Sequence, residues 1–434
     1  MMPSTDAAYI ALVSLAAAGA RALRRGLPLG WRLRLEASPP ENLQPGWVWL
    51  HAVSVGELIL AKGLAEKLLE ARHRVHLTTG TAAGLALLGE RIPAWDQGRG
   101  LLSGGAFPVD DPEGLRPFLR TPPGAFIALE TELWPNLLRQ LEGLGVPRII
   151  VNGRLTARSS GQSGLGGLGR PWLKRAAERL SLVAARDAES ADAFRSLGAP
   201  KVALGGNLKA DLPSPAPLAA RWEGLRSAWQ ESPVLVAGST LEGEEALVLE
   251  AWMRLRSDHP SLRLILAPRQ PKRFQPVAEL LREQGHGFLR ASGTWPEGVD
   301  PWRSVGILLL DTLGELPAVY GEGTVALVGG GWRGKGGHNP LEPVRWGIPT
   351  LIGPGFHNFE DLVGPLRAAH RLNVVEEPGL EAAIQSALET APLRGPGWGG
   401  TADLPEGLAG ALETVWNLLR PYLPAAMGPG ILEK

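Results

Sequence analysis

Residues 48–79 read VWLHAVSVGELILAKGLAEKLLEARHRVHLTT. The apolar run Val48–Val53 predicts a strand, Glu57–Arg72 predicts a helix with apolar residues at helical spacing, and Val75–Thr79 predicts a second strand. Short runs of this kind, each followed by a helical segment, are typical of parallel strands that are buried under helices. This stretch therefore predicts one strand–helix–strand unit of an α/β protein.

The same alternation continues along most of the chain. Further strands are predicted at 125–129, 148–151, 180–184 and 202–204, and then at 234–237, 262–266, 305–310, 324–328, 350–352 and 372–375. The proline-rich segment Asp211–Pro217 (DLPSPAP) predicts a linker, Gly395–Gly400 a second break, and Gly407–Leu423 a final amphipathic helix. Two similar α/β halves joined by a hinge predict two doubly wound domains that face each other.

The composition excludes several classes of protein. The 434 residues include 44 Lys+Arg and 44 Asp+Glu, and this zero net charge argues against a general nucleic-acid-binding protein. The chain has no cysteine, so disulfides, thiolate zinc sites and a cysteine nucleophile are excluded. Its eight histidines suggest no metal-binding constellation.

The amino-terminal segment leaves two interpretations open. The apolar run Ala7–Ala20 is followed by Arg21, Arg24 and Arg25, and it is shorter than the ~20 residues that span a bilayer. A signal peptide is disfavoured because the basic cluster lies on the wrong side of the run. The segment is either an ordinary first helix or a shallow anchor that keeps the protein at the cytoplasmic side of a membrane.

Two groups of acidic residues follow predicted strands in the first half. Ser54 and Glu57 have the spacing of a capping box, but an acid at a strand's carboxyl end is also where a general base belongs. Glu130 and Glu132 follow another strand, with Pro135 at the start of the next helix. Either both are solvated loop acids or, because strand ends converge at one edge of a parallel sheet, Glu130 shares a cleft with Glu57.

The second half contains a glycine-rich loop, Gly329–Gly334, that matches G-x-G-x-x-G after a strand. No helix follows at once and no acid ends a strand about 20 residues on, so a dinucleotide site is poorly supported. A second match, Gly164–Gly169, predicts a flexible loop. Asn339, Pro340 and Glu342 fit a helix start; the alternative is that the loop and this helix cradle a phosphate while Glu342 binds ribose hydroxyls.

The segment Leu266–Phe274 (LAPRQPKRF) ends a strand with three cations. These side chains are either surface charges or an anion-binding group at the strand's carboxyl end.

Together these segments resemble the 3-deoxy-D-manno-oct-2-ulosonic acid (Kdo) transferases of lipopolysaccharide assembly. The matching strings are HAVSVGE (51–57), ETELWPN (130–136), NGRLTARS (152–159), GNLKAD (206–211), AGSTLEGEE (237–245), APRQPKRF (267–274), DTLGEL (311–316), GGHNPLEP (336–343) and WGIPTLIGP (346–354). They occur in the family's order over residues 45–375. Gln270 and Leu241 stand where the family usually has histidine.

The resemblance implies two Rossmann-like domains facing across a cleft, in the inverting glycosyltransferase-B arrangement. The expected parts are a membrane-associating segment 1–40, an acceptor domain 41–210 and a donor domain 218–423. It also implies a CMP-Kdo donor, a lipid A precursor as acceptor, no metal or cofactor, and a place at an anionic membrane surface, the cytoplasmic face of the inner membrane.

The resemblance also implies roles for individual residues. Glu57 corresponds to the general base, and Glu130 and Lys209 to residues that stabilise the transition state. The donor-binding residues would be Pro268, Arg269, Leu313, Gly314, Glu315, Asn339, Pro340, Leu341 and Glu342. Arg269, Lys209 and helix N-termini could then stabilise the leaving phosphate without a metal ion.

Other functions remain open at this point. A sugar-nucleotide epimerase of the same fold should lack ETELWPN, and a non-catalytic sugar-nucleotide- or lipid-binding protein would not need Glu57, Glu130 and Lys209 together. A NAD-dependent oxidoreductase fits the glycine string alone.

Overall fold

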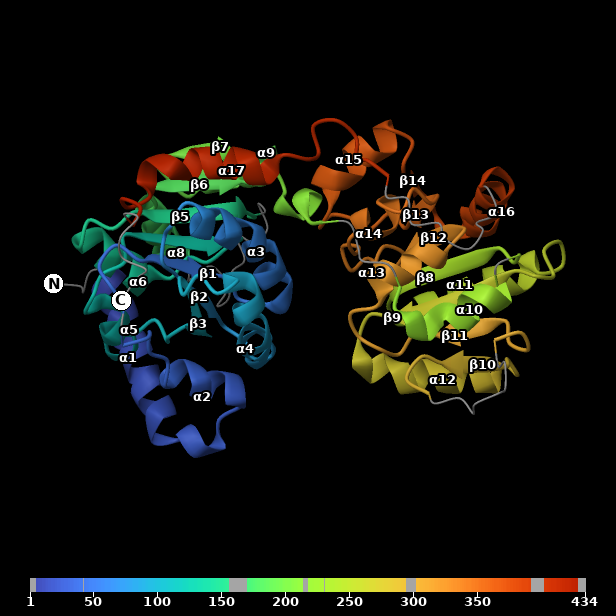
Figure 1. The fold of residues 1–434 in the computed structure, drawn as a ribbon, viewed down its shortest axis with the longest axis horizontal. Helices are drawn as coiled ribbons and strands as arrows, with labels where there is room; N and C mark the ends of the chain where they lie inside the picture. Colours follow the sequence, from blue (N-terminus) through green and yellow to red (C-terminus); the bar gives the residue numbers. More distant parts are fainter. Residues whose placement is uncertain are drawn as a thin grey trace. The chain divides into compact units, whose positions relative to one another are not determined.

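A computed structural model of the chain describes residues 5–41, 43–155, 170–213, 218–229, 231–293, 302–391 and 402–427 (Figure 1). The chain divides into two compact units, Met1–Leu212 with Gly410–Lys434, and Pro213–Ala409. Each unit holds one seven-stranded sheet, and the prediction of two Rossmann-like domains is confirmed. The predicted loop 164–169, the break 395–400 and the linker residues 214–217 lie outside the described residues.

The sheet of the first unit has the order β3-β2-β1-β4-β5-β6-β7, and all neighbouring strands are parallel. Its strands are β1 (Val48–His51), β2 (Val75–Thr79), β3 (Leu102–Ala106), β4 (Ala125–Leu129), β5 (Arg148–Gly153), β6 (Leu182–Ala185) and β7 (Val202–Leu204). The strand order reverses between β1 and β4. In doubly wound sheets ligands bind outside the carboxyl ends of the strands at such a switch point.

Helices cover both faces of this sheet. The helices are α3 (Val55–Glu70), α4 (Ala82–Asp96), α5 (Pro112–Leu119), α6 (Pro135–Gly143), α8 (Arg170–Glu178), α9 (Ala188–Ser196), η2 (Leu208–Asp211) and α17 (Ala411–Leu419), which is followed by η7 (Arg420–Tyr422). Figure 1 shows the helices packed around the sheet. Apolar side chains of α3, α4 and α17 form one core layer, and those of α5, α6, α8 and α9 contribute to the other. The strands between the layers are almost wholly buried, which explains their continuous apolar sequence.

Several helices of the first unit begin at a side-chain cap directly after a strand or loop. Ser54, Thr81, Asp111 and Asp187 are in extended conformation, and each side chain accepts a hydrogen bond from the backbone N–H three residues later. These are the residue types that satisfy the otherwise unpaired N–H groups of a first helical turn. The caps therefore fix where the chain leaves each loop.

The second unit also has an all-parallel sheet, with the order β10-β11-β9-β8-β12-β13-β14. It differs from the first sheet because β11 lies between β10 and β9, and its switch point lies between β8 and β12. The strands are β8 (Val234–Thr240), β9 (Arg263–Pro268), β10 (Phe288–Arg290), β11 (Ile307–Leu309), β12 (Val325–Val328), β13 (Thr350–Ile352) and β14 (Asn373–Val374). The helices are η3 (Ala220–Trp222), α10 (Glu223–Trp229), α11 (Glu244–Leu255), η4 (Pro271–Arg273), α12 (Phe274–Glu283), α13 (Leu316–Val319), η5 (Tyr320–Glu322), α14 (Leu341–Val344), α15 (Glu360–Ala368), η6 (Glu377–Gly379) and α16 (Leu380–Thr390).

The last helix differs from the expected division of the chain. The sequence analysis assigned residues 218–423 to one domain, whereas α17 packs on the first unit. Its buried residues Ala411, Val415 and Leu419 recur every fourth position and join the core layer of α3. Asp211 holds the start of α17 by accepting hydrogen bonds from the N–H groups of Gly410 (2.6 Å) and Leu412.

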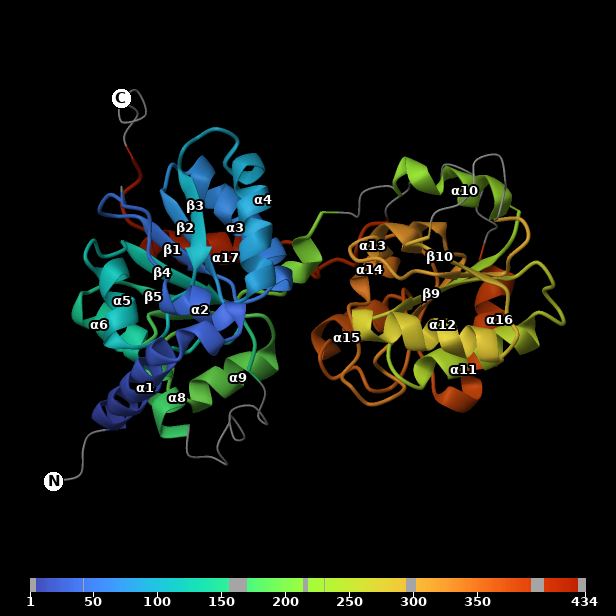
Figure 2. The ribbon, with the colours of Figure 1, turned by 90° about the horizontal axis from the view of Figure 1, so that it is seen from below.

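The amino-terminal segment forms α1 (Thr5–Ala22), η1 (Arg24–Gly26) and α2 (Leu29–Leu35). Helix α1 lies beside α6 and α8 (Figure 2). None of the helices in the described part of the chain combines the length and hydropathy that a bilayer crossing requires.

Candidate functional site

The two acidic groups predicted in the first half meet at the β1/β4 switch point. Glu57 lies in the first turn of α3, after β1, and Glu130 directly follows β4, the neighbour of β1. The negative charge of Glu130 acts on the Glu57 carboxyl, so the two side chains share one electrostatic environment. The structure thus brings together the two residues that the sequence analysis placed after two different strands.

Glu57 has the features of both a cap and a base. Its carboxylate accepts hydrogen bonds from Val53 N–H (2.8 Å) and the Ser54 hydroxyl (2.9 Å), while Ser54 Oγ accepts from Glu57 N–H (3.4 Å). Burial raises the pKa of the Glu57 carboxyl to about 7; the Val53 and Ser54 hydrogen bonds oppose this shift, and Glu130 and Glu132 add to it. A carboxyl poised near neutral pH is suited to take a proton in catalysis.

Glu130 has a strained backbone. Its φ of +59° lies in the left-handed region, which costs a non-glycine residue about 1–3 kcal/mol and is typical of functional positions. Its N–H donates to Val151 O of the neighbouring strand β5 (3.0 Å). The conformation turns the chain sharply at the end of β4 and fixes the direction in which the following acids leave the sheet.

Lys209 lies in η2, after β7, and is half-buried. Asn207 Oδ1 accepts from Lys209 N–H (3.1 Å), and Asn152 Oδ1, from the end of β5, accepts from Leu208 N–H (2.9 Å). The side-chain amides of Asn207 and Asn152 thus hold the turn that carries Lys209 at the carboxyl edge of the first unit's sheet.

Sequence reasoning missed Asn152 as a site residue. It is buried, its φ is +50°, and among the described residues its Nδ2 has no hydrogen-bond partner. An asparagine at the end of an apolar strand run was the available signal, because asparagine tolerates the left-handed conformation.

His51 and Glu132 were also missed as a pair. His51, the last residue of β1, is fully buried; its Nδ1 lies 3.0 Å from Thr78 O and its Nε2 lies 3.5 Å from Glu132 Oε2. The same Glu132 oxygen accepts from Trp134 Nε1 (2.7 Å). Glu132 is therefore held by groups from both sides of the switch point.

In the second unit the glycine loop packs on a buried carboxylate. Glu244, at the start of α11, is fully buried and accepts hydrogen bonds from the N–H groups of Gly330 (2.7 Å), Trp332 (3.1 Å) and Leu241 (3.0 Å). A Cβ on Gly329 would lie 2.5 Å from Ser239 O, so the loop needs glycine for this close packing. The amides of Gly330 and Trp332 are thus occupied by Glu244, and a phosphate at this loop would have to use other groups.

Arg269 follows β9, whose last residue is Pro268, and its side chain is exposed. Its N–H donates to Thr240 O at the end of β8 (3.0 Å). Burial, and secondly the charge of Arg269, lower the pKa of the His338 imidazole to about 4. Arg269 and His338, which follows the glycine-rich loop, therefore lie close enough to interact electrostatically.

The predicted helix start after the glycine loop is confirmed with a shift of register. Helix α14 begins at Leu341 with Pro340 as its N-cap, and Asn339 Oδ1 accepts from Leu341 N–H (3.2 Å). Asn339 Nδ2 lies 3.4 Å from Glu342 Oε1. The negative charge of Glu342 also acts on the buried Tyr320 hydroxyl.

The segment Leu313–Glu315 combines exposed and internally bonded groups. Leu313 is 70% exposed and Gly314 has a φ of +85°. The carboxylate of Glu315, in contrast, accepts from Trp222 Nε1 (2.9 Å), forms an ion pair with Arg221 and accepts from the Thr312 hydroxyl. The side chain of Glu315 therefore anchors η3, and any donor contact from this segment would come from its backbone or from Leu313.

The described residues contain no group of three or more His, Asp or Glu side chains placed to hold a metal ion.

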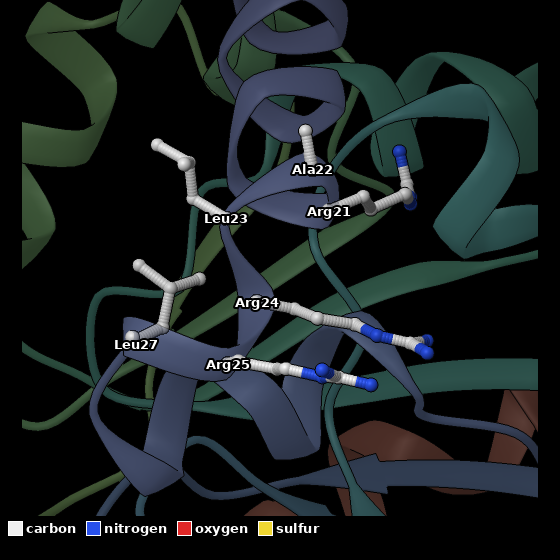
Figure 3. Close-up of a pocket in the computed structure, with 7 residues that line it drawn as sticks. Arg21, Ala22, Leu23, Arg24, Arg25 and Leu27 are labelled. Carbon is white, nitrogen blue, oxygen red and sulfur yellow. The ribbon is translucent and has the colours of Figure 1, made fainter.

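A cavity of about 680 Å³ is lined by residues 21–27, between α1 and α2. Figure 3 shows Arg21, Arg24 and Arg25 pointing to one side of this segment and Leu23 and Leu27 to the other.

Comparison with known proteins gives consistent results. Residues 29–212 match the family described as 3-deoxy-D-manno-octulosonic-acid transferase (kdotransferase). The 3-deoxy-D-manno-octulosonic acid transferase of Haemophilus influenzae is 33% identical over 87% of this chain and 88% of its own length, and that of Bordetella pertussis is 36% identical over 79% and 78%. Among solved structures, a putative UDP-N-acetylglucosamine 2-epimerase from Listeria monocytogenes superimposes with a TM-score of 0.57 at 12% identity, over 87% of this chain and 97% of its own; this likeness concerns the fold alone.

Proposed function

The chain belongs to the 3-deoxy-D-manno-octulosonic acid transferase family, which are glycosyltransferases, and we propose that it moves Kdo from CMP-Kdo to a hydroxyl of a lipid A precursor. The observation that carries the proposal is the half-buried carboxyl of Glu57, with a pKa raised to about 7, at the β1/β4 switch point. In this proposal the first unit binds the acceptor, and the second unit binds the donor through Pro268–Arg269, Leu313–Glu315 and Asn339–Glu342.

The proposed reaction inverts the configuration at the anomeric carbon of Kdo in one displacement. The acceptor oxygen forms a bond to that carbon as the bond to the CMP phosphate breaks, and Glu57 takes the proton of the acceptor hydroxyl. Negative charge passes to the phosphate, where Arg269 and Lys209 would stabilise it, so the proposal needs no metal ion. Glu130 would face the positive charge that develops on the sugar.

Val53 N–H and the Ser54 hydroxyl orient the base in this scheme. They bind different oxygens of the Glu57 carboxylate, Oε2 and Oε1 respectively, and hold it against rotation. The capping arrangement is thus part of how the base is positioned, rather than an alternative to it.

We also propose that the amino-terminal helices dock on an anionic membrane surface, at the cytoplasmic face of the inner membrane. Large apolar side chains of this segment are more than half exposed: Leu12 51%, Leu15 75%, Leu23 72%, Leu29 53% and Trp31 51%. Arg24 and Arg25 lie among them and are exposed as well. Exposed apolar groups with neighbouring arginines are typical of helices that lie in a membrane interface.

The decisive test is incubation of the protein with CMP-Kdo and a lipid A precursor in the presence of a chelator, with the product mass determined. We expect the acceptor to gain Kdo, and we expect Glu57→Gln to abolish the gain while Glu66→Gln retains it. Glu66 is a suitable control because it lies on the same helix and pairs with Lys62 (2.6 Å) on its surface. Isomerisation of a nucleotide sugar without any acceptor would instead support an epimerase, and CMP-Kdo binding without turnover a non-catalytic binding protein.

A further inference from the structure

The helix that follows the Glu130 segment receives its cap from elsewhere in the chain. Within the described residues, Trp134 at the N-cap of α6 provides no side-chain hydrogen bond to the helix. Asp110, between β3 and α5, does so instead: its Oδ2 accepts from Asn136 N–H (3.0 Å) and its Oδ1 from Leu137 N–H (2.8 Å). Asp110 is only 2% exposed, so this contact is internal.

Asp110 and its neighbour Asp111 both bind helix α1. The Tyr9 hydroxyl donates to Asp110 Oδ2 (2.9 Å), and both terminal nitrogens of Arg21 donate to the carboxylate of Asp111, each at 2.9 Å. A two-point arginine–carboxylate contact fixes orientation as well as distance. Helix α1 is therefore attached to the residue that caps α6.

Helix α2 reaches the segment by a second route. Arg34 donates from Nε to Phe107 O (3.3 Å) and from Nη2 to Pro108 O (3.1 Å), and its guanidinium lies 5.0 Å from the ring centroid of Trp134. Trp134 in turn donates to Glu132, whose charge acts on both Glu57 and Arg34. Arg34 is half-buried, so this contact is shielded in part from solvent.

We propose that Arg34 and Asp110 are positioning residues that make the amino-terminal helices hold the Glu130–Trp134 segment in its active geometry. The segment needs support from its surroundings because Glu130 has an unfavourable backbone conformation. Helices α1 and α2 then have a second role besides docking on a membrane, and deficient packing of these helices lowers the rate of transfer even where no membrane is present. This inference rests on the proposed Kdo transfer and extends it.

The test separates positioning from membrane attachment by assaying the full chain with the lipid A precursor dispersed in detergent micelles. We expect Arg34→Gln to lower kcat roughly tenfold or more, because small displacements of catalytic groups are costly, with the KM for CMP-Kdo nearly unchanged. Arg116→Gln is the matched control, an exposed arginine in the last turn of α5 in the same unit, and it should keep the rate of the unsubstituted chain. Thermal unfolding of each variant checks that the fold is intact.

A double-substitution cycle provides a readout that a general loss of stability would not reproduce. If Arg34 acts through Trp134, then Arg34→Gln combined with Trp134→Leu should reduce kcat about as much as the worse single change. If the double substitution instead lowers kcat by the product of the two single effects, Arg34 and Trp134 act independently and the proposal is overturned. Equal rates of Arg34→Gln and Arg116→Gln in micelles would overturn it as well.

Two further outcomes remain interpretable. If Arg34→Gln does not fold, Tyr9→Phe is the alternative variant, because it removes the hydroxyl through which α1 binds Asp110. An unchanged kcat for Tyr9→Phe contradicts the proposal. If the unsubstituted chain transfers no Kdo, the proposed function fails; if it does and the variants equal it, only the positioning role fails.

Discussion

The two switch points of the molecule use the same local structure to different ends. In each unit the helix after the first central strand carries a glutamate in its first turn, Glu57 in α3 and Glu244 in α11, whose carboxylate accepts backbone N–H groups. Glu244 is fully buried and accepts from three backbone groups, whereas Glu57 is half-buried and accepts from one. This difference predicts that Glu57, whose hydrogen bonds leave part of the carboxylate accessible, is the reactive acid, and that Glu244, whose carboxylate is saturated, is structural.

The largest effect should come from Glu57→Gln, which keeps the side-chain shape and removes the proposed base. We expect transfer to fall by ~10²–10⁴-fold, the range for loss of a general base, with CMP binding by isothermal titration unchanged. Glu66→Gln on the same helix should behave like the unsubstituted chain. Near-normal turnover of Glu57→Gln would remove Glu57 from the mechanism and erase the contrast with Glu244.

Glu244→Gln should act on stability instead. The amide NH₂ cannot accept, so at least one of the N–H groups of Gly330, Trp332 and Leu241 loses its partner, at a cost of about 1–3 kcal/mol in the free energy of unfolding. We expect urea unfolding to report this loss, accompanied by weaker CMP binding. Glu250→Gln, which changes an exposed ion pair with Arg254 on the same helix, should have little effect. A Glu244→Gln protein of unchanged stability would show that the buried carboxylate is not structural.

Glycine at position 130 separates strain from chemistry. Glu130→Gly and Glu130→Ala both remove the carboxylate, but only glycine adopts the φ of +59° without penalty, so Glu130→Gly should be more stable by about 1 kcal/mol. Chemical denaturation of the two variants measures this difference, and both should be impaired in transfer. Equal stability would mean that the left-handed conformation at the end of β4 costs little.

The pH profile provides the finest comparison. The proposed mechanism requires ionised Glu57, so kcat/KM should fall as the pH drops below about 7. Because Glu130 raises the pKa of Glu57, Glu130→Gln should move this limb to lower pH, by less than about one pH unit. A limb that does not move would show that the two carboxyls are not coupled.

The same pKa shift has a consequence for stability with a definite sign. The folded-state pKa of Glu57 lies above its ordinary value of 4.5, so its contribution to stability is present below that value and is lost as the pH rises to about 7. Glu57→Gln cannot lose it. The free energy of unfolding should therefore decline less between pH 5 and pH 8 in Glu57→Gln than in the unsubstituted protein.

Most of the fold was predictable because strands buried on both faces have continuous apolar sequences. The strands β2, β4, β7 and β13 begin and end where the sequence predicted them. Two edge strands were missed. Leu102–Ala106 (LSGGA) is mostly glycine and small residues, and Phe288–Arg290 has only three residues, so neither has an apolar pattern that can be recognised without its neighbour in the sheet.

The candidate site was predictable only in part. Glu57 and Glu130 follow apolar runs, and strand ends of a parallel sheet share an edge, so their meeting could be anticipated. The contacts of Asp110 with Asn136 and of Glu244 with Gly330 could not, because they join residues 26 and 86 positions apart through backbone groups that carry no sequence signal. The internal role of Glu315 was hidden for the same reason, since Arg221 and Trp222 lie more than 90 positions away.

The return of α17 to the first unit affects the order in which the protein can form during synthesis. The core layer around Leu58 and Leu64 is completed by Val415 and Leu419, which leave the ribosome only after all of Pro213–Ala409. The second unit is one uninterrupted stretch and can fold as soon as it has emerged. The first unit emerges earlier but cannot complete its core until α17 has been made. One apolar face of this unit therefore stays uncovered for most of the chain's translation.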